Sequence, residues 1–377
     1  MNNYYTKTAQ VTLKDEKKAI AELASKIYQD EMAGVIFFCS AEYNPDILAK
    51  EIDKNFSCLV VGCTTAGEIG AEYQTDGIVG ISFSSKVFRL HAQVIDPVDD
   101  CKPENVKKFT DRIKSKLEFS KSFDPQKMFG FLLIDGLSVM EEHVTATLYG
   151  ALEGLSIVGG SAGDSLKFKE TRIFTDGRFI SNAAVFTIIE TRLPFSTFKL
   201  QHFVPSENEM VVTEADPDKR IVYEIDGGLA AAEYAALVGV DVKELNAAVF
   251  AMYPVMLQIG DEWYVRSIQK VNNDGSLTFY CAIESGLVLT VGKGVGLVET
   301  LRERVKKFQA EFERIECTLG CDCILRRLEI MKKGEKEKIE HEFKKINFLG
   351  FSTFGEQYNS IHINQTLTGV VFGAREA

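Results

Sequence analysis

The stretch FLGFSTFGEQYNSIHINQTLTGVVFG, residues 348–373, contains the pattern that decides the fold. An apolar run leads to Gly350, Gly355 is followed by the acid Glu356, and a second apolar run reaches Phe372. The same pattern occurs twice more, from Gly62 through Gly67 and Glu68 to Phe83, and from Gly159 through Gly163 and Asp164 to Phe186. Glycine permits tight turns and a close approach of two backbones. The repetition therefore predicts a strand–glycine turn–strand corner that the fold uses more than once.

Outside these corners, apolar segments of strand length alternate with amphipathic helical segments. Strands are predicted at 34–39, 57–63, 77–84, 87–95, 128–135 and 179–189, and helices at 14–29, 103–118 and 295–312. The pattern predicts an α/β protein of the α+β type with two domains. Each domain is a mixed, largely antiparallel sheet covered by helices, with duplicated corners. Prolines interrupt the short apolar pieces between residues 190 and 214, so we expect domains at 1–214 and 215–377.

The composition of the chain argues against a nucleic-acid partner and against a membrane segment. The 377 residues carry a net charge of −11 with no basic cluster, which argues against a nucleic-acid partner. No apolar run approaches the roughly 20 residues that span a bilayer, and the first residues lack the apolar stretch of a signal peptide. We therefore expect a cytoplasmic protein without a membrane segment. The eight cysteines then stay reduced, and most are expected to be buried apolar residues.

Catalytic motifs are weak. The segment GGSAGD around Ser161 resembles a nucleophile elbow only loosely, because alanine replaces a glycine. Cysteines 317, 321 and 323 have an awkward spacing for zinc. We therefore expect no enzymatic activity, although hydrolysis through Ser161 stays open as an alternative. The polar residues in and beyond the corners are instead candidates for a ligand pocket: Cys63, Thr64, Glu68, Ser161, Glu356, Asn364 and Thr366.

Two histidines and two arginines are candidates for cofactor binding. His202 shares a strand face with Phe198 and Leu200, so its ring is expected to point inward, and His362 lies beside the third corner. A haem iron needs an imidazole in an apolar pocket. Arg326 and Arg327 are consecutive and point different ways, so one can pair with an acid while the other stays free for an anion such as a haem propionate.

Several segments together resemble the FIST proteins, which have paired FIST N-terminal and FIST C-terminal domains and act as intracellular signal-transduction sensors. The resemblance spans roughly residues 30 to 375 and rests on LVVGCTTAGEI, IDGLSVMEEHVTATLYGAL, IVGGSAGD and FLGFSTFGEQ. Further segments, VVTEADPDKRIVYEIDG (211–227), CDCILRRLE (321–329) and HINQTLTGVVFG (362–373), resemble the haem-binding, nitric-oxide-sensing branch of that family.

The resemblance implies a sensor of a diatomic gas that holds haem b non-covalently. It also implies an output partner, either a histidine kinase or a cyclic-di-GMP synthase or phosphodiesterase. The family's axial ligand does not carry over to a particular residue, so the local argument keeps His202 and His362 as the candidate iron ligands. The alternative is a sensor of a small organic ligand, such as an amino acid, without haem. A homodimer also stays open.

Overall fold

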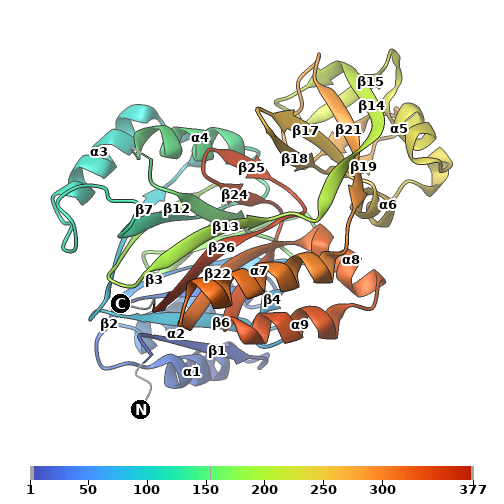
Figure 1. Cartoon of the computed structure of the whole chain (residues 1–377). Coiled ribbons are helices and arrows are strands. Elements are labelled where there is room, and N and C mark those ends of the chain that lie inside the picture. The colour runs from blue at the N-terminus through green and yellow to red at the C-terminus, as the bar shows by residue number, and fades with distance from the viewer. Residues whose placement is uncertain (1–3, 153, 375–377) are drawn as a thin grey trace.

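The computed structural model describes residues 4–152 and 154–374. A large body and a smaller lobe make up the molecule (Figure 1), and the lobe comprises residues 203–294. The described residues of the body form three six-stranded sheets, and those of the lobe form one eight-stranded sheet. This mixed α+β architecture agrees with the predicted fold class. The predicted boundary between residues 214 and 215 lies inside the lobe strand β14 (Phe203–Asp216).

The first body sheet has the strand order β1 (Thr6–Val11), β6 (Ile78–Ser84), β2 (Met32–Ser40), β3 (Leu59–Thr65), β10 (Ile173–Thr175) and β11 (Arg178–Ile180). The second has β7 (Phe88–Ile95), β12 (Ala184–Thr191), β8 (Met128–Ile134), β9 (Ile157–Ser161), β24 (Glu356–Tyr358) and β25 (Ile361–Ile363). The third has β13 (Phe195–Leu200), β26 (Leu367–Ala374), β22 (Arg314–Cys323), β23 (Phe348–Thr353), β4 (Glu68–Ile69) and β5 (Tyr73–Gln74).

The body contains three copies of one unit, each of which supplies most of one sheet. We call them repeat 1 (β1 to β6, residues 6–84), repeat 2 (β7 to β12, residues 88–191) and repeat 3 (β13 to β26, residues 195–374). In each repeat two parallel strands are joined through helices: β2 to β3 by α2 (Pro45–Asn55), β8 to β9 by α4 (Glu141–Ala151), and β22 to β23 by α8 (Ile324–Lys332) and α9 (Lys336–Lys345). A later strand, β6, β12 or β26, then pairs antiparallel with the first of the two. The predicted corner pattern is the sequence signature of this threefold repetition.

The repeats exchange hairpins. The hairpin β4–β5 of repeat 1 extends the sheet of repeat 3, the hairpin β24–β25 of repeat 3 extends the sheet of repeat 2, and the hairpin β10–β11 of repeat 2 extends the sheet of repeat 1. Each hairpin follows its glycine corner. The corners therefore carry the chain from one sheet to the next, which explains why close backbone approach is needed there.

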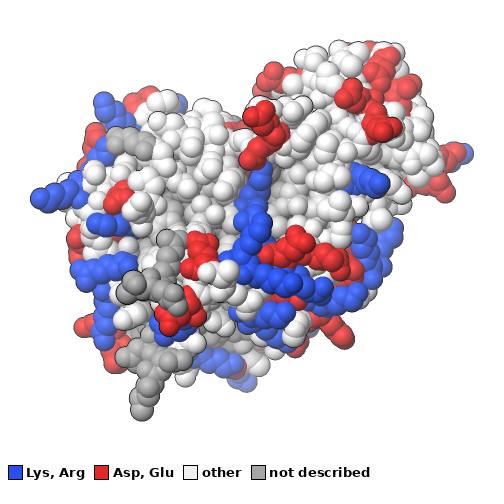
Figure 2. Space-filling model, viewed as in Figure 1, with Lys and Arg blue, Asp and Glu red and all other residues white. Residues whose placement is uncertain are grey.

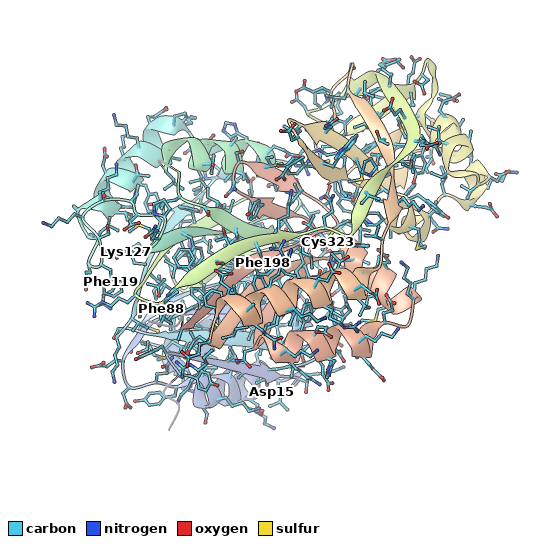
Figure 3. The ribbon with its side chains drawn as sticks, viewed as in Figure 1. Asp15, Phe88, Phe119, Lys127, Phe198 and Cys323 are labelled. Carbon is cyan, nitrogen blue, oxygen red and sulfur yellow. The ribbon has the colours of Figure 1, made fainter. Side chains whose placement is uncertain are left out.

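One core lies between the three sheets, and helices cover their outer faces (Figure 1). Rings from all three repeats meet in this core: Phe83 and Phe88 are 5.1 Å apart, and Phe129 and Phe372 are 5.7 Å apart. The first sheet is covered by α1 (Glu16–Ile27) and α2, the second by α3 (Pro103–Lys114) and α4, and the third by α7 (Leu297–Glu311) and α9. Phe198 of β13 lies beside α7 (Figure 3), with its ring 5.0 Å from that of Phe308.

The lobe is inserted into repeat 3, between β13 and α7. Its sheet has the order β18 (Glu262–Arg266), β17 (Val255–Ile259), β21 (Val288–Gly294), β14, β15 (Ile221–Ile225), β20 (Leu277–Phe279) and β19 (Ile268–Val271), and β16 (Gly228–Leu229) pairs with β15. Two helices, α5 (Ala230–Val238) and α6 (Ala247–Met252), complete it. Acidic side chains gather over its visible face (Figure 2). No helix among the described residues is long and apolar enough to cross a membrane.

Polar contacts hold the lobe against the body. Arg220 of the lobe forms ion pairs with Glu141 and Glu142 of α4, at 2.5 and 2.6 Å. Arg266 donates to the carbonyl of His362 at 2.7 Å, and the Ser267 hydroxyl lies 2.9 Å from Oε1 of Gln365. Because buried charges and amides need partners, these contacts favour one orientation of the lobe.

Candidate functional site

The three corners interlock at the centre of the body. Backbone N–H groups of each corner donate to carbonyls of another: Ala66 to Ser352 at 3.0 Å, Gly163 to Thr64 at 3.0 Å, and Phe354 to Ser161 at 3.2 Å. Gly163 illustrates the steric need, because a Cβ there would lie 2.6 Å from the backbone nitrogen of Ala66. The glycines of the corners are therefore architectural, as their pattern indicated.

Two of the corner acids, Glu68 and Glu356, form hydrogen bonds within this framework. Glu68 accepts a hydrogen bond from the Thr65 hydroxyl at 2.6 Å, and Glu356 accepts from Thr353 and from both the N–H and the hydroxyl of Thr366. Burial raises the pKa of both Glu68 and Glu356 to about 8. Both carboxyls are therefore largely protonated at neutral pH, and Oε2 of Glu68 has no hydrogen-bond partner among the described residues.

The other pocket candidates are also buried. Cys63 packs in the central core, and the hydroxyl of Thr64 accepts from the Arg172 N–H at 3.0 Å. The hydroxyl of Ser161 accepts from the Gln357 amide at 3.0 Å, and Asn364 accepts from the Ser267 N–H at 3.2 Å. The structure brings these residues together as the hydrogen-bonded interior of the body and its junction with the lobe, and not as the rim of the cavity described below.

His202 points inward, as its strand position predicted, but both of its ring nitrogens have partners. Nδ1 lies 3.2 Å from a guanidinium nitrogen of Arg326, and Nε2 lies 2.8 Å from the Glu329 carboxylate. A guanidinium only donates, so Nδ1 accepts and the ring proton resides on Nε2. Burial is the main reason why the pKa of His202 is lowered, which keeps the ring neutral.

His362 is held in the same way. Its Nδ1 lies 3.2 Å from the Gln357 amide nitrogen, and its Nε2 lies 3.3 Å from the carbonyl oxygen of Tyr280. Burial again lowers its pKa. Gly355 packs directly on the ring, where a Cβ would lie 2.2 Å from Cε1. Neither histidine presents a free nitrogen to a cavity, so the two residues do not fit the role of a haem axial ligand in this arrangement.

The consecutive arginines have different surroundings. Arg326 is fully buried, and its Nε donates to Asp322 at 2.6 Å. Arg327 is 7% exposed and has no carboxylate within 4 Å in the described part of the chain. Its guanidinium donates to the carbonyl of Gln74 at 3.0 Å and lies 5.4 Å from the centre of the Tyr73 ring. A buried cation without a carboxylate in contact is costly, so Arg327 is a candidate anion-binding group.

Arg327 lies in the wall of a cavity of about 580 Å³ between the repeats. Repeat 1 contributes Tyr43 and Ala66, repeat 2 contributes Leu166, and α8 contributes Ile324, Leu328 and Met331. At its rim Lys14 and Asp76 lie near an ion pair of Glu42 with Lys167. A mostly apolar cavity with one buried cation has the character of a small-molecule site.

Sequence reasoning named Arg327 but missed the cavity itself. Its lining residues run from Leu13 to Met331, and the threefold exchange of hairpins brings them together. The signal that was present locally was the pair of adjacent arginines on one short helix.

Two family models match the chain, and the boundary between them, at residues 228–230, lies inside the lobe. The FIST N domain matches residues 33–228, and the FIST C domain matches residues 230–359. A comparison with curated proteins gave no match. FIST domains are sensory domains of signal transduction that bind small ligands. The chain belongs to the FIST family of sensor proteins.

Proposed function

We propose that this protein senses a small organic molecule with a carboxylate group, such as an amino acid, which binds in the cavity beside Arg327. The observation that carries the proposal is the buried guanidinium of Arg327, 7% exposed and without a carboxylate partner within 4 Å among the described residues. A ligand carboxylate supplies the missing negative charge. A charge-assisted hydrogen bond of this kind is about twice as strong as a neutral one.

The rest of the cavity suits an amino acid. Carboxylates at the rim, Asp76 and Glu42, offer partners for an ammonium group, although Glu42 also pairs with Lys167. The apolar wall of Ile324, Leu328 and Met331 offers a surface for an apolar side chain. Polar groups that fix orientation and apolar groups that supply contact area are the usual composition of ligand pockets.

The ligand signal needs a partner. We propose that the protein acts in the cytoplasm on a histidine kinase or a cyclic-di-GMP enzyme and has no catalytic role of its own. The family match supports a sensory role, and the resemblance described above supports the choice of partner. Haem b with nitric oxide as the ligand stays a prediction from that resemblance. An absorption spectrum after haem reconstitution tests it, because a bound haem gives a Soret band.

The test of the cavity is thermal unfolding with each of the twenty common L-amino acids and with the corresponding decarboxylated amines. We expect at least one amino acid to raise Tm and its amine to have no effect. A ligand at 100 times its Kd stabilises by about 2.7 kcal/mol. In Arg327→Met the rise should disappear, whereas in the rim control Lys14→Met it should persist. Absence of any rise in the wild-type protein would refute the proposal.

A further inference from the structure

A chain of buried polar side chains crosses repeat 3. The Tyr73 hydroxyl donates to Asp322 at 2.7 Å, and the other oxygen of Asp322 accepts from Arg326 at 2.6 Å. Arg326 contacts His202 at 3.2 Å, and His202 contacts Glu329 at 2.8 Å. Glu329 ends the chain in an ion pair with Lys333 at 2.6 Å. We call this set the α8 chain, because Arg326 and Glu329 belong to α8.

The α8 chain has a single order of donors and acceptors. Tyr73 and Arg326 both donate to Asp322. Arg326 also donates to Nδ1 of His202, and His202 donates its only ring N–H to Glu329. Every bond therefore depends on the position of its neighbour. Buried networks of this kind are rigid, and each group that they leave unpaired is costly. Nη2 of Arg326 is already without a hydrogen-bond partner among the described residues, so any further lost bond adds to that cost. A displacement at one end must be followed by the other members or leave a buried group without its partner.

One end of the α8 chain lies at the cavity. The ring of Tyr73 lies beneath the guanidinium of Arg327, 5.4 Å from its central carbon, and the carbonyl of Gln74 accepts from the same guanidinium. Arg326 directly precedes Arg327 on the helix. A ligand that draws the Arg327 guanidinium into the cavity therefore acts on the strand of Tyr73 and on the helix of Arg326.

The other end lies where the body joins the lobe. His202 occupies the two-residue link between β13 and β14, through which the chain enters the lobe. Its carbonyl accepts from the N–H of Val295 at 2.8 Å, in the segment through which the chain returns to α7. The two connections of the lobe are thus tied together at His202. Glu329 and Lys333 line a cleft of about 400 Å³ that also includes lobe residues such as Met252 and Tyr253.

We propose that the α8 chain couples the cavity to the lobe, so that occupation of the cavity at Arg327 changes the stability of the lobe connection at His202. The regulatory meaning of this coupling rests on the proposed function, because it makes the lobe the part that responds to the ligand. His202 and Arg326 act as positioning residues. His202 lies in the link and its ring contacts Arg326, whereas Arg327 contacts the ligand.

The test measures amide hydrogen exchange at the lobe connection, in peptides covering residues 201–206 and 293–297. Tyr73→Phe removes the first bond of the α8 chain. His202→Leu removes the bonds of the His202 ring to Arg326 and Glu329. We expect exchange at the connection to become about tenfold faster in both variants, equivalent to about 1.4 kcal/mol. The matched control is Tyr43→Phe, because Tyr43 also lies at the cavity but donates to Leu13 and is outside the α8 chain.

Two further variants separate coupling from simple loss of stability. In His202→Gln the amide can accept from Arg326 and donate to Glu329, so exchange should stay within twofold of the wild type. In the double variant, Tyr73→Phe should add no further acceleration to His202→Leu, because the chain is already broken. Additive effects, equal acceleration by Tyr43→Phe, or unchanged exchange in Tyr73→Phe would each overturn the proposal. The experiment uses no ligand, so it can fail while the amino-acid test succeeds, and the reverse.

Discussion

Replacing Gly67 by alanine should damage both the stability of the body and the candidate site. Gly67 has a φ of +135°, a region that residues with a side chain rarely adopt. A Cβ at this position would lie 1.7 Å from a terminal nitrogen of Arg327 and 2.6 Å from its central carbon. The backbone is held by the Thr65 hydroxyl, which accepts from the Gly67 N–H at 3.0 Å. The guanidinium must therefore leave its position.

The expected decrease in the free energy of unfolding is the sum of two separate losses. Backbone strain of this kind costs about 1–3 kcal/mol. Displacing Arg327 breaks its bond to the carbonyl of Gln74, and a hydrogen bond that involves a charged group contributes about 1.5–3 kcal/mol. Together these losses lower the free energy of unfolding by about 2.5–6 kcal/mol. The displaced guanidinium also leaves the cavity wall, so stabilisation by an amino acid should be lost.

Urea unfolding followed by circular dichroism measures the change. The control is Gly150→Ala in α4, where a Cβ meets no atom within 4 Å. This control should be more stable than the wild type by roughly 0.5–1 kcal/mol, because alanine favours the helix. A loss below about 1 kcal/mol in Gly67→Ala would refute the steric argument. Retained stabilisation by an amino acid in the same variant would separate Gly67 from the site.

Two further predictions concern the lobe and the corner acids. Arg220→Met leaves the buried Glu141 without its partner, so it should destabilise the protein by about 3–5 kcal/mol and accelerate proteolysis between lobe and body. The control Lys219→Met should leave proteolysis unchanged, and equal sensitivity of both variants would contradict the role of Arg220. The pKa of Glu356 is raised to about 8, so the folded state keeps a proton that the unfolded chain loses at lower pH. Stability contributed by this group is present at low pH and is lost as pH rises from about 5 to about 8, by up to about 1.4 kcal/mol per pH unit. Glu356→Gln should reduce this slope in unfolding experiments across that range, whereas the surface control Glu22→Gln should not, and an unchanged slope in Glu356→Gln would show that Glu356 does not titrate there.

Local sequence patterns were sufficient to predict many elements of the fold. The apolar periodicity of residues 14–29, 103–118 and 295–312 predicted helices that the structure contains as α1, α3 and α7. The three glycine corners indicated an internal repetition, because each corner brings backbones too close together for a side chain. The adjacent arginines indicated two different environments, because successive residues on a helix point in different directions.

Local patterns were insufficient for the candidate site. His202 and His362 were both expected near ligands, and the strand pattern predicted an inward ring for His202. Their hydrogen-bond partners lie far away in sequence, Glu329 for His202 and Tyr280 for His362. An inward histidine that binds iron and one that completes a buried network have the same local sequence, so only the positions of these distant partners distinguish them.

The sequence by itself determined the elements, the corners that connect them and the residue types available for chemistry, because helix periodicity, strand alternation and glycine turns depend on neighbouring residues. Tertiary structure decided which hairpin joins which sheet, where the lobe is inserted and which polar groups remain without partners. The candidate site is such an outcome, because Tyr43, Leu166 and Arg327 are distant in sequence and line one cavity only once the three repeats have exchanged their hairpins. A candidate site defined by an unpaired buried charge becomes visible only when all other pairs have been formed.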